Sequence, residues 1–292
     1  MSTFPFQNIA IIGLGLMGGS LALALRARGY TGILQGAGGS ASDLGLARSA
    51  QGHGRAVFDE ICEDPADLPL GAVDLLILAV PPAALSVYFA LAAENLPAAA
   101  VVTDLASVKA NNVAKGEALL GARYQSSHPL IGAEQHGFAA AHADLYRDYR
   151  CILCQGSVTD AEVDERLTGF WTALGAEVLH LDVATHDTAL AATSHLPHLL
   201  AFAYLELLGA EPELALLAGG GLRDFSRIAA SDPRLWADIL WQNRAAVRAR
   251  LARLQEGLGR LDGVLAGEDP APLLASLSRG QQTRSRFRFP SS

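Results

Sequence analysis

The stretch that decides the fold is NIAIIGLGLMGGSLALALRARGY, residues 8–30. It opens with NIAIIG (8–13), a short apolar run rich in β-branched residues, which is typical of a strand buried in a parallel sheet. A glycine-rich turn follows at once, and GSLALALRARGY (19–30) then has the leucine and alanine spacing of a helix that ends near Gly29. We therefore expect the first strand, turn and helix of a βαβ unit.

The turn itself predicts a binding site for a dinucleotide. It consists of Gly13, Leu14, Gly15, Leu16, Met17 and Gly18, which form a G-x-G-x-x-G sequence between strand and helix. In that arrangement the first glycine permits a tight turn, the second lets a pyrophosphate approach the backbone, and the third lets the helix pack closely on the strand. The N–H groups at the helix N-terminus then hold the phosphates.

The segment after the second predicted strand bears on which cofactor binds. An acidic residue there usually bonds the ribose 2′-hydroxyl of NAD. Here residues 35–42 read QGAGGSAS, and no carboxylate occurs before Asp43. Small residues and the hydroxyls of Ser40 and Ser42 leave room for a 2′-phosphate, so the sequence favours NADP. No arginine stands at that position to bind the phosphate, and NAD therefore remains an alternative.

Further apolar segments continue the alternation of strand and helix. Strand candidates are residues 32–36, 73–80, 99–108, 150–155 and 176–182, with a helix expected over 160–175. The segment VDLLILAV (73–80) stops at Pro81, and we expect Val80 and Pro81 to lie against the cofactor. This alternation with short links predicts an α/β fold, with a Rossmann-type doubly wound parallel sheet over residues 1–182.

Beyond Asp182 the strand signals stop, and residues 183–292 predict an all-α domain. From Pro233 onward a seam recurs at steps of three or four, as in one long amphipathic helix. Its positions are Trp236, Leu240, Asn243, Val247, Leu251, Leu254, Leu258, Leu261 and Leu265. The short remaining chain cannot cover so broad a stripe, so we expect a homodimer built on this domain. Packing against a helix predicted over 186–208 is the alternative, and the basic tail, residues 281–292, is assigned no role.

Composition limits the class of partner. The chain has 292 residues, 50% hydrophobic and 18% charged, which is enough to bury a large core in about two domains. A net charge of −8 and a pI near 5.4 argue against general affinity for nucleic acid or an anionic membrane, because both need clustered Lys and Arg. The N-terminal residues lack the basic and apolar pattern of a signal peptide, and no apolar stretch reaches about 18 residues, so we expect no signal peptide, a small-molecule substrate and a cytoplasmic location.

The cysteines and histidines predict no metal site. Cys151 and Cys154 form a C-x-x-C, but the surrounding YRCILCQ is typical of a strand, in which residues three apart point to opposite faces. We therefore interpret both as core thiols, too few with Cys62 for a disulfide framework. His195 and His198 lie three apart on one face of a predicted helix start, yet no third ligand with helical spacing accompanies them.

Three polar clusters occur where such a sheet places its site, at the carboxyl ends of strands and in the loops that follow. They are DLASVK (104–109), SHPLIGAE (127–134) and SHLPH (194–198). A dehydrogenase that oxidises an alcohol needs a base near the carbinol, and histidine is the side chain whose pKa suits that task at neutral pH. The histidines of these clusters are therefore the candidate bases.

The ordered series of motifs resembles a known family. It comprises IIGLGLMGGSLALAL, DLLILAVPP, VTDLASVK, HPLIGAEQHG, SHLPHLLAFAYL and GGGLRDFSRIAASDPRLWADI. In this order the motifs are similar to those of the prephenate and arogenate dehydrogenases of tyrosine biosynthesis, from about residue 9 to about residue 245. The His-Pro…Gly-x-Glu and Ser-His-Leu-Pro-His segments carry the specificity, because the glycine turn alone fits many reactions. The resemblance implies oxidative decarboxylation of prephenate or arogenate with a nicotinamide dinucleotide.

The same resemblance implies roles for five polar residues. His128 is hydrogen-bonded to the ring hydroxyl of the substrate and acts as base or polariser during hydride transfer. Ser107 assists at that hydroxyl and orients His128 near the nicotinamide. His198, with His195 nearby, contacts the substrate or shapes its pocket. Arg227 binds a substrate carboxylate, which a guanidinium clamps through two parallel hydrogen bonds.

Several alternatives stay open. The β-hydroxyacid dehydrogenases share a similar glycine-rich start and a helical second domain, but they are expected to carry a catalytic lysine in the helical half, and no lysine follows Lys115. The second alternative is a non-catalytic protein that senses NAD(P)H. In such a protein, nothing would require the three polar clusters to lie close together. The choice between prephenate and arogenate is open as well, with Glu134 a candidate partner for the ammonium of arogenate.

Overall fold

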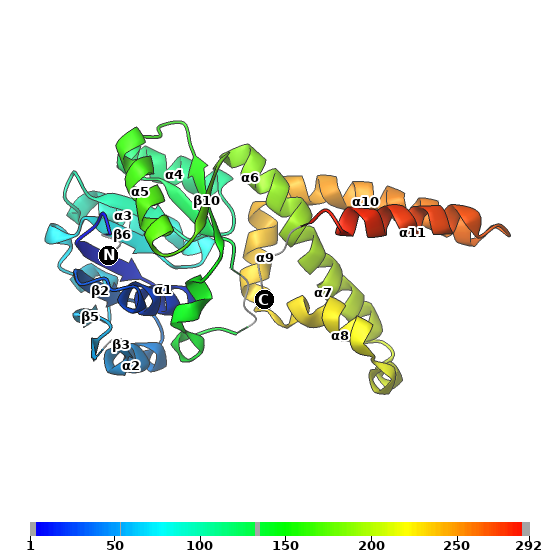
Figure 1. Ribbon diagram of the computed structural model, residues 1–292, viewed down its shortest axis with the longest axis horizontal. Coiled ribbons are helices and arrows are strands. Elements are labelled where there is room, and N and C mark those ends of the chain that lie inside the picture. The colour runs from blue at the N-terminus through cyan, green and yellow to red at the C-terminus, as the bar shows by residue number, and fades with distance from the viewer. Residues whose placement is uncertain (1–3, 53, 132–134, 288–292) are drawn as a thin grey trace.

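The computed structural model describes residues 4–52, 54–131 and 135–287, and it has two parts (Figure 1). The N-terminal part is a sheet flanked by helices, and the C-terminal part consists of helices. The predicted fold class, a Rossmann-type α/β domain followed by an all-α domain, is confirmed. No helix within the described ranges is long and apolar enough to span a bilayer.

Five parallel strands form the centre of the N-terminal part, in the order β5-β2-β1-β6-β7. They are β1 (Asn8–Ile12), β2 (Ile33–Ala37), β5 (Glu60–Cys62), β6 (Leu75–Leu78) and β7 (Val101–Asp104). β1 pairs with β2 on one side and with β6 on the other, so the chain changes sides after β5. Such a reversal of strand order opens a crevice at the carboxyl ends of the strands, where ligands of doubly wound folds bind.

Helices cover both faces of this sheet. They are α1 (Leu16–Ala27), α2 (Ala41–Ser49), α3 (Leu85–Asn95), α4 (Ala110–Leu120) and α5 (Ala161–Ala173). Leu21 of α1 and Phe170 of α5 belong to the apolar core on one face. Phe89 of α3 and Val113 of α4 belong to the core on the other face. The two cores hold the central strands rigidly, and they fix the positions of the loops at the strand ends.

Three further strands form a second sheet, in the order β10-β9-β8. They are β8 (Ser126–Pro129), β9 (Arg150–Gln155) and β10 (Glu177–Asp182), and β3 (Gln51–Gly52) and β4 (Arg55–Ala56) form a small separate hairpin. A parallel bridge between Val102 and Tyr124 joins β8 to β7, whereas β8 runs antiparallel to β9. The doubly wound parallel sheet predicted over residues 1–182 is therefore present in β1, β2, β5, β6 and β7, and the antiparallel β8 departs from it. Its sequence, SSHP, lacks the apolar pattern of a strand, and the sequence analysis had placed it in a loop.

The glycine turn has the geometry that its sequence predicts. Gly13 has φ +102°, and a Cβ there would lie 2.3 Å from the carbonyl oxygen of Ala79, the residue directly after β6. A Cβ on Gly18 would lie 2.1 Å from the carbonyl oxygen of Gly13. Neither position tolerates a larger residue without movement of the backbone, so both glycines are required for the close packing of β1, β6 and α1.

The two cysteines of the C-x-x-C lie on opposite faces of β9. Cys151 packs in the core that contains Trp171, and Cys154 packs with Leu190 in a separate small cluster. Both thiols are free and buried, and burial raises their pKa values. The interpretation of Cys151 and Cys154 as core thiols is confirmed.

The helical part contains α6 (Val183–Leu190), α7 (Leu196–Leu208), α8 (Gly220–Ser226), α9 (Pro233–Gln242), α10 (Arg244–Leu265) and α11 (Ala271–Arg284). A single π-helical turn, Ala191–His195, joins α6 to α7. Pro197 follows in the first turn of α7. Proline has no backbone N–H and so cannot donate a helical hydrogen bond to the preceding turn. The helix expected over 186–208 is therefore present, with this wider turn inside it.

The single long helix expected from Pro233 to Leu265 is wrong, because the chain bends between α9 and α10 (Figure 1). Asn243 stands at the bend with φ −99° and ψ 21°. Its side-chain amide donates a hydrogen bond of 2.8 Å to the carbonyl oxygen of Asp187, which holds the corner against α6. α10 and α11 then form a hairpin that projects from the body, and residues 281–284 of the basic tail complete α11.

Candidate active site

A cavity of about 620 Å³ lies between the two parts of the molecule and holds most of the residues that the sequence singled out. One wall consists of the turn between β1 and α1, the segments after β6 and β7, and β8. The other consists of the π turn, α7, α9 and the short helix η9 (Arg227–Ala230). The predicted residues that line it are Gly15, Leu16, Met17, Val80, Pro81, Ser107, His128, His198 and Arg227.

The glycine turn offers this cavity a set of open backbone donors. No side chain caps α1 at Gly15, and the first turn of α1 contains no acidic residue. A Cβ built on Gly15 would meet no atom within 4 Å, so the backbone there is accessible. Free N–H groups at the positive end of a helix dipole fit an anionic pyrophosphate. Leu14, in contrast, is fully buried in the core and supports the turn from behind.

The loop after β2 does not reach this cavity. Ser40 is the N-cap of α2 and forms a capping box with Asp43, whose carboxylate Oδ2 accepts a 2.7 Å hydrogen bond from the Ser40 hydroxyl, while Ser42 is exposed. Asp43 Oδ1 also accepts a bond of 2.6 Å from the backbone N–H of Phe138. Burial alone would raise the pKa of Asp43, but these hydrogen bonds lower it below its ordinary value. Asp43, the first carboxylate after β2, therefore contacts Ser40 of the loop that precedes it.

His128 is the buried histidine of the cavity wall, on β8. Its side chain is buried, and its Nδ1 lies 2.8 Å from Nε2 of His186 on α6. Burial lowers the pKa of His128 well below 6.5, and the positive charge of Lys109 adds to this effect. The imidazole is therefore neutral at neutral pH. Because Nδ1 is engaged, Nε2 is the nitrogen left for a ligand in the cavity.

His186 and Asp187 are residues of the site that the sequence analysis missed. Nδ1 of His186 lies 2.8 Å from Oδ1 of Asp187, and that carboxylate also accepts the backbone N–H groups of Lys109 at 3.0 Å and Ala110 at 2.9 Å. No signal in the sequence marks them, because they stand in the interior of α6 and His186 is 58 positions from His128. The fold brings them together.

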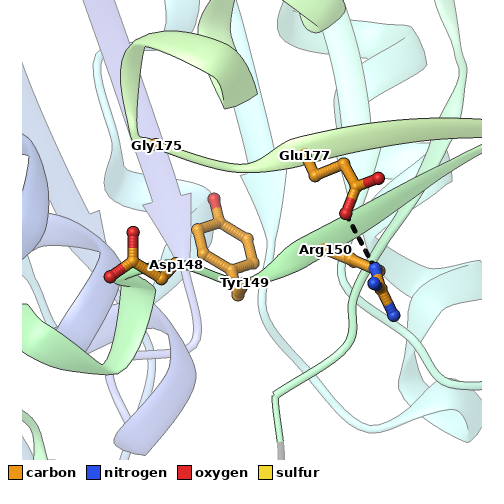
Figure 2. Close-up of a pocket in the computed structure, with 5 residues that line it drawn as sticks. All are labelled: Asp148, Tyr149, Arg150, Gly175 and Glu177. Atoms are coloured by element: carbon orange, nitrogen blue, oxygen red, sulfur yellow. Dashed lines mark hydrogen bonds and ion pairs between the residues drawn. The ribbon is translucent and has the colours of Figure 1, made fainter. Parts of the chain in front are cut away.

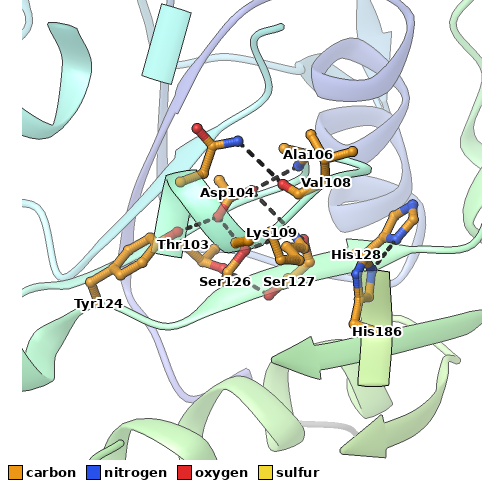
Figure 3. A network of polar contacts seen from close by, with 12 residues as sticks. Thr103, Asp104, Ala106, Val108, Lys109, Tyr124, Ser126, Ser127, His128 and His186 are labelled. Atoms are coloured by element: carbon orange, nitrogen blue, oxygen red, sulfur yellow. Dashed lines mark hydrogen bonds and ion pairs between the residues drawn. The ribbon is translucent and has the colours of Figure 1, made fainter. Parts of the chain in front are cut away.

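Beneath the cavity lies a buried polar network that joins β7, β8 and α4 (Figure 3). Lys109 forms a fully buried ion pair with Asp104 at 3.1 Å, and its ammonium also donates to the Ser126 hydroxyl at 2.6 Å and to the Ser127 carbonyl at 2.7 Å. Tyr124 donates a 2.7 Å hydrogen bond to the other oxygen of Asp104. The network satisfies every charge it buries, and it ties the segment that carries Ser107 to the strand that carries His128.

The helical wall presents an aromatic and a cationic surface. The rings of His198 and Trp236 stack with centroids 3.4 Å apart and planes inclined by 16°. His198 Nδ1 lies 2.9 Å from the carbonyl oxygen of Ser194, which leaves Nε2 for the cavity. Burial lowers the pKa of His198, and the nearby charge of Arg227 lowers it further. His198 is therefore neutral beside a guanidinium at neutral pH.

His195 does not line the cavity, unlike Ser107, His128, His198 and Arg227. It is buried behind the wall, and its Nδ1 accepts a 3.0 Å hydrogen bond from the amide of Asn243. Burial lowers its pKa to about 4. Within the described ranges, no group of three or more His, Cys, Asp or Glu side chains is arranged to hold a metal ion. Glu134 lies outside the described residues.

A second, smaller hollow of about 250 Å³ lies where β9 and β10 begin (Figure 2). Two of the residues that line it, Arg150 of β9 and Glu177 of β10, form an ion pair with each other at 2.8 Å. None of the residues predicted for the site lines this hollow. The large cavity is therefore the candidate active site.

The glycine turn and the buried neutral His128 face the same cavity, and helices form its far wall. These features define a class, the dinucleotide-binding proteins with a helical second domain. Comparison with known families narrows that class. Residues 21–180 match the nucleotide-binding domain of prephenate dehydrogenase, and residues 182–279 match its dimerization domain. The chain belongs to the prephenate dehydrogenase family.

Individual relatives agree over nearly the whole chain. The cyclohexadienyl dehydrogenase of Zymomonas mobilis is 31% identical over 287 residues, which are 96% of this chain and 95% of that protein. The structure of prephenate dehydrogenase from A. aeolicus, in complex with hydroxyphenyl propionate and NAD+, has a TM-score of 0.89 and 30% identity, and the match covers 96% and 97% of the two chains. Synechocystis arogenate dehydrogenase has a TM-score of 0.80 and 26% identity, covering 96% and 100%.

Proposed function

We propose that this chain catalyses the oxidative decarboxylation of prephenate or arogenate with a nicotinamide dinucleotide, the reaction that leads to 4-hydroxyphenylpyruvate or tyrosine. The observation that carries the proposal is the shared cavity. It joins an open glycine turn, which fits a pyrophosphate, with the buried neutral His128 and with Arg227 on the opposite wall. Membership of the prephenate dehydrogenase family supports the same reaction.

In the proposed reaction His128 is the base. When bound, the nicotinamide supplies the hydride acceptor for the substrate's ring carbon. His128 Nε2 takes the proton of the hydroxyl on that carbon, and Ser107, on the same wall, holds the hydroxyl toward the imidazole. When the ring then loses CO₂ and becomes aromatic, the protonated His128 is placed to return that proton to the phenolate oxygen. The protein's main task is to position the substrate against the nicotinamide and to polarise its hydroxyl.

The helical wall holds the other end of the substrate in this proposal. Arg227 clamps a substrate carboxylate through two charge-assisted hydrogen bonds, and the neutral His198, whose Nδ1 donates to the Ser194 carbonyl, accepts one more hydrogen bond at its Nε2. Stacking on Trp236 keeps the His198 ring in place. His195 acts indirectly, through its hydrogen bond to Asn243 at the corner between α9 and α10.

The cofactor we propose is NADP, with NAD accepted as well. Gly38 stands directly after β2 where an NAD-specific site carries an acid, and this favours NADP. Two features keep the preference small. The Asp43 carboxylate lies at the Ser40 hydroxyl, and Arg48 of α2 pairs with Glu63 at 3.5 Å. We therefore expect kcat/KM values for the two cofactors to lie within about tenfold of each other, a difference of about 1.4 kcal/mol.

Two further expectations remain proposals. The domains divide after Asp182, where β10 ends and α6 begins, and two copies associate through the helical domain. Exposed leucines on the α10–α11 hairpin support that association. A cytoplasmic location stays a prediction from the sequence.

One assay tests the proposed function. Formation of reduced nicotinamide is followed with prephenate, with arogenate and with a 3-hydroxy acid, each offered with NAD and with NADP. Turnover of prephenate or arogenate, and none of the 3-hydroxy acid, is the expected result. Turnover of the 3-hydroxy acid alone would establish the β-hydroxyacid alternative, and turnover of none of the three, with a dinucleotide still bound, would establish the sensing protein.

A further inference from the structure

A chain of three buried side chains leads away from the cavity. His128 Nδ1 lies 2.8 Å from His186 Nε2 (Figure 3). His186 Nδ1 in turn lies 2.8 Å from Asp187 Oδ1. The exposed fractions of the three residues are 7%, 0% and 7% in that order, so water does not compete for these hydrogen bonds. The proposed reaction uses His128 and gives no role to the other two.

The positions of the protons follow from the far end of this chain. Asp187 accepts the backbone N–H groups of Lys109 and Ala110, and although burial raises its pKa, the hydrogen bonds from His186 and from the backbone lower it below its ordinary value. Asp187 is therefore a carboxylate, which can only accept, and His186 Nδ1 must carry the proton between them. Burial lowers the pKa of His186, so its ring is neutral and its Nε2 is an acceptor. The proton between the two imidazoles then belongs to His128 Nδ1.

We propose that His186 and Asp187 are positioning residues that hold His128 as the tautomer protonated at Nδ1, so that Nε2 carries the lone pair facing the cavity. The reverse arrangement, with the proton on His186 Nε2, would leave His128 Nε2 protonated and unable to accept the hydroxyl proton. The inference rests on the proposed function for the reaction that His128 performs, but the tautomer itself is a property of the resting protein. Asp187 also fixes the start of α4, so one carboxylate orders both the base and the neighbouring loop.

The charges around the pair are compatible with this role. Lys109 and Asp104 face it from α4 and β7 as an ion pair, and His195 approaches from the π turn as a neutral ring. The negative charge of Asp187 is the one closest to His186. When His128 Nε2 receives a proton, the hydrogen bond from its Nδ1 to His186 strengthens and spreads the new positive charge toward Asp187. No proton has to leave the chain for this stabilisation.

The tautomer is measurable without substrate. In the full-length protein with ¹⁵N-labelled histidine, ring correlations at neutral pH report which nitrogen of each imidazole is protonated, and the His128→Asn variant identifies the signals of His128. We expect His128 to be protonated at Nδ1 and His186 at Nδ1. A wild-type His128 protonated at Nε2 would overturn the proposal, whatever reaction the enzyme performs.

Substitutions at His186 connect the tautomer to the rate. His186→Phe removes the acceptor but keeps a ring of similar size, whereas His186→Gln offers an amide oxygen in its place. For His186→Phe we expect His128 to change to the Nε2-protonated tautomer and kcat to fall by about 10²-fold with KM within threefold, since a positioned acid–base group contributes about that much. His186→Gln should recover most of kcat and the original tautomer.

A matched control is available on the surface. His180 pairs with Asp164 at 3.0 Å on the exposed side of β10, so His180→Phe removes a His–Asp pair outside the cavity. It should leave both kcat and the His128 tautomer unchanged. If His186→Phe raised KM and left kcat and the tautomer as in the wild type, His186 would be a packing residue and the proposal would fail. If the wild type turned over neither prephenate nor arogenate, the proposed function would fail while the tautomer measurement still decided the positioning role.

Discussion

Arg227 stands on η9 at the helical wall of the cavity, opposite His128, and its charge reaches His198. A guanidinium in this place is expected to bind a substrate carboxylate through charge-assisted hydrogen bonds, each of which contributes about 1.5–3 kcal/mol. Arg227→Ala should therefore raise KM for the substrate by about tenfold or more and leave the dissociation constant of the dinucleotide unchanged. Steady-state kinetics and cofactor titration measure the two effects.

The control for Arg227 lies four positions earlier in the chain. Arg223 is exposed and pairs with Asp224 at 3.1 Å, and it does not line the cavity. Arg223→Ala should leave KM unchanged. An unchanged KM in Arg227→Ala, or an equal rise in both variants, would contradict the assignment of Arg227 to the substrate carboxylate.

The pH dependence of the rate reports on His128. Burial, followed by the charge of Lys109, lowers its pKa well below 6.5 in the folded protein, and the proposed base must be neutral to accept a proton. Protonation removes the base as pH falls through that lowered value. We therefore expect kcat/KM to stay level as pH falls from 7.5 to 6.5 and to decline only below 6.5. A midpoint near or above 6.5 for this limb in the free enzyme would contradict a buried neutral His128.

At the residue scale, the sequence predicted polar residues that the fold brings to one cavity, but it did not predict the residues that support them. The cavity between the two parts is lined by four of the predicted polar residues, Ser107, His128, His198 and Arg227. Strand ends and the loops after them converge in a doubly wound fold, which brings such residues together. His186 could not be found in this way. Its importance comes from a contact with His128, and a contact between residues 58 positions apart has no signature in one sequence.

At the scale of elements, the buried Lys109–Asp104 ion pair joins the end of β7 to the start of α4. Removal of one partner from a buried ion pair leaves an unpaired charge and costs about 3–5 kcal/mol. Lys109→Met should therefore lower the free energy of unfolding by about that amount, measured by urea denaturation. Lys115, the other lysine of the chain, lies exposed on α4, and Lys115→Met should change stability by less than about 0.5 kcal/mol. Equal stabilities of the two variants would show that the ion pair is not structurally important.

The elements also show where sequence patterns fail. The strands with apolar runs were predicted closely, and residues 150–155 coincide with β9. β8 was missed because its side chains are polar and are satisfied by the buried network, which the sequence does not reveal. The bend at Asn243 was missed because the spacing of the seam continues through it. Hydrogen bonds from Asn243 to Asp187 and His195 stabilise the corner, and these partners are distant in sequence.

At the scale of the whole molecule, the α10–α11 hairpin projects from the body (Figure 1). It carries several exposed leucines. Leu258 and Leu265 of α10 are 53% and 67% exposed, and Leu274 and Leu277 of α11 are 68% and 60% exposed. Exposed leucines so concentrated on one hairpin are typical of a surface that a second copy covers. The division into an α/β part and a helical part was predictable from the sequence, because strand patterns stop at one point. The α10–α11 hairpin was not predictable, because the residues after Leu265 have no clear helical pattern of apolar residues.

A paired substitution tests the assembly. Leu258→Asp combined with Leu274→Asp places charges on both helices of the hairpin and should convert a dimer into monomers, as measured by sedimentation equilibrium. Leu119→Asp, at an exposed leucine of α4 in the other part, should leave the dimer intact. A monomeric wild type, or a double variant that sediments as the wild type does, would contradict a dimer built on this hairpin.

The central claim is that His128 takes the hydroxyl proton of prephenate or arogenate in the cavity beside the glycine turn. The most direct measurement is the initial rate of nicotinamide reduction by the wild type and by His128→Asn, with the dinucleotide dissociation constant measured for both proteins. We predict turnover by the wild type, a kcat lower by about 10²-fold or more in the variant, and equal cofactor affinity. Near-normal turnover in His128→Asn would contradict the account.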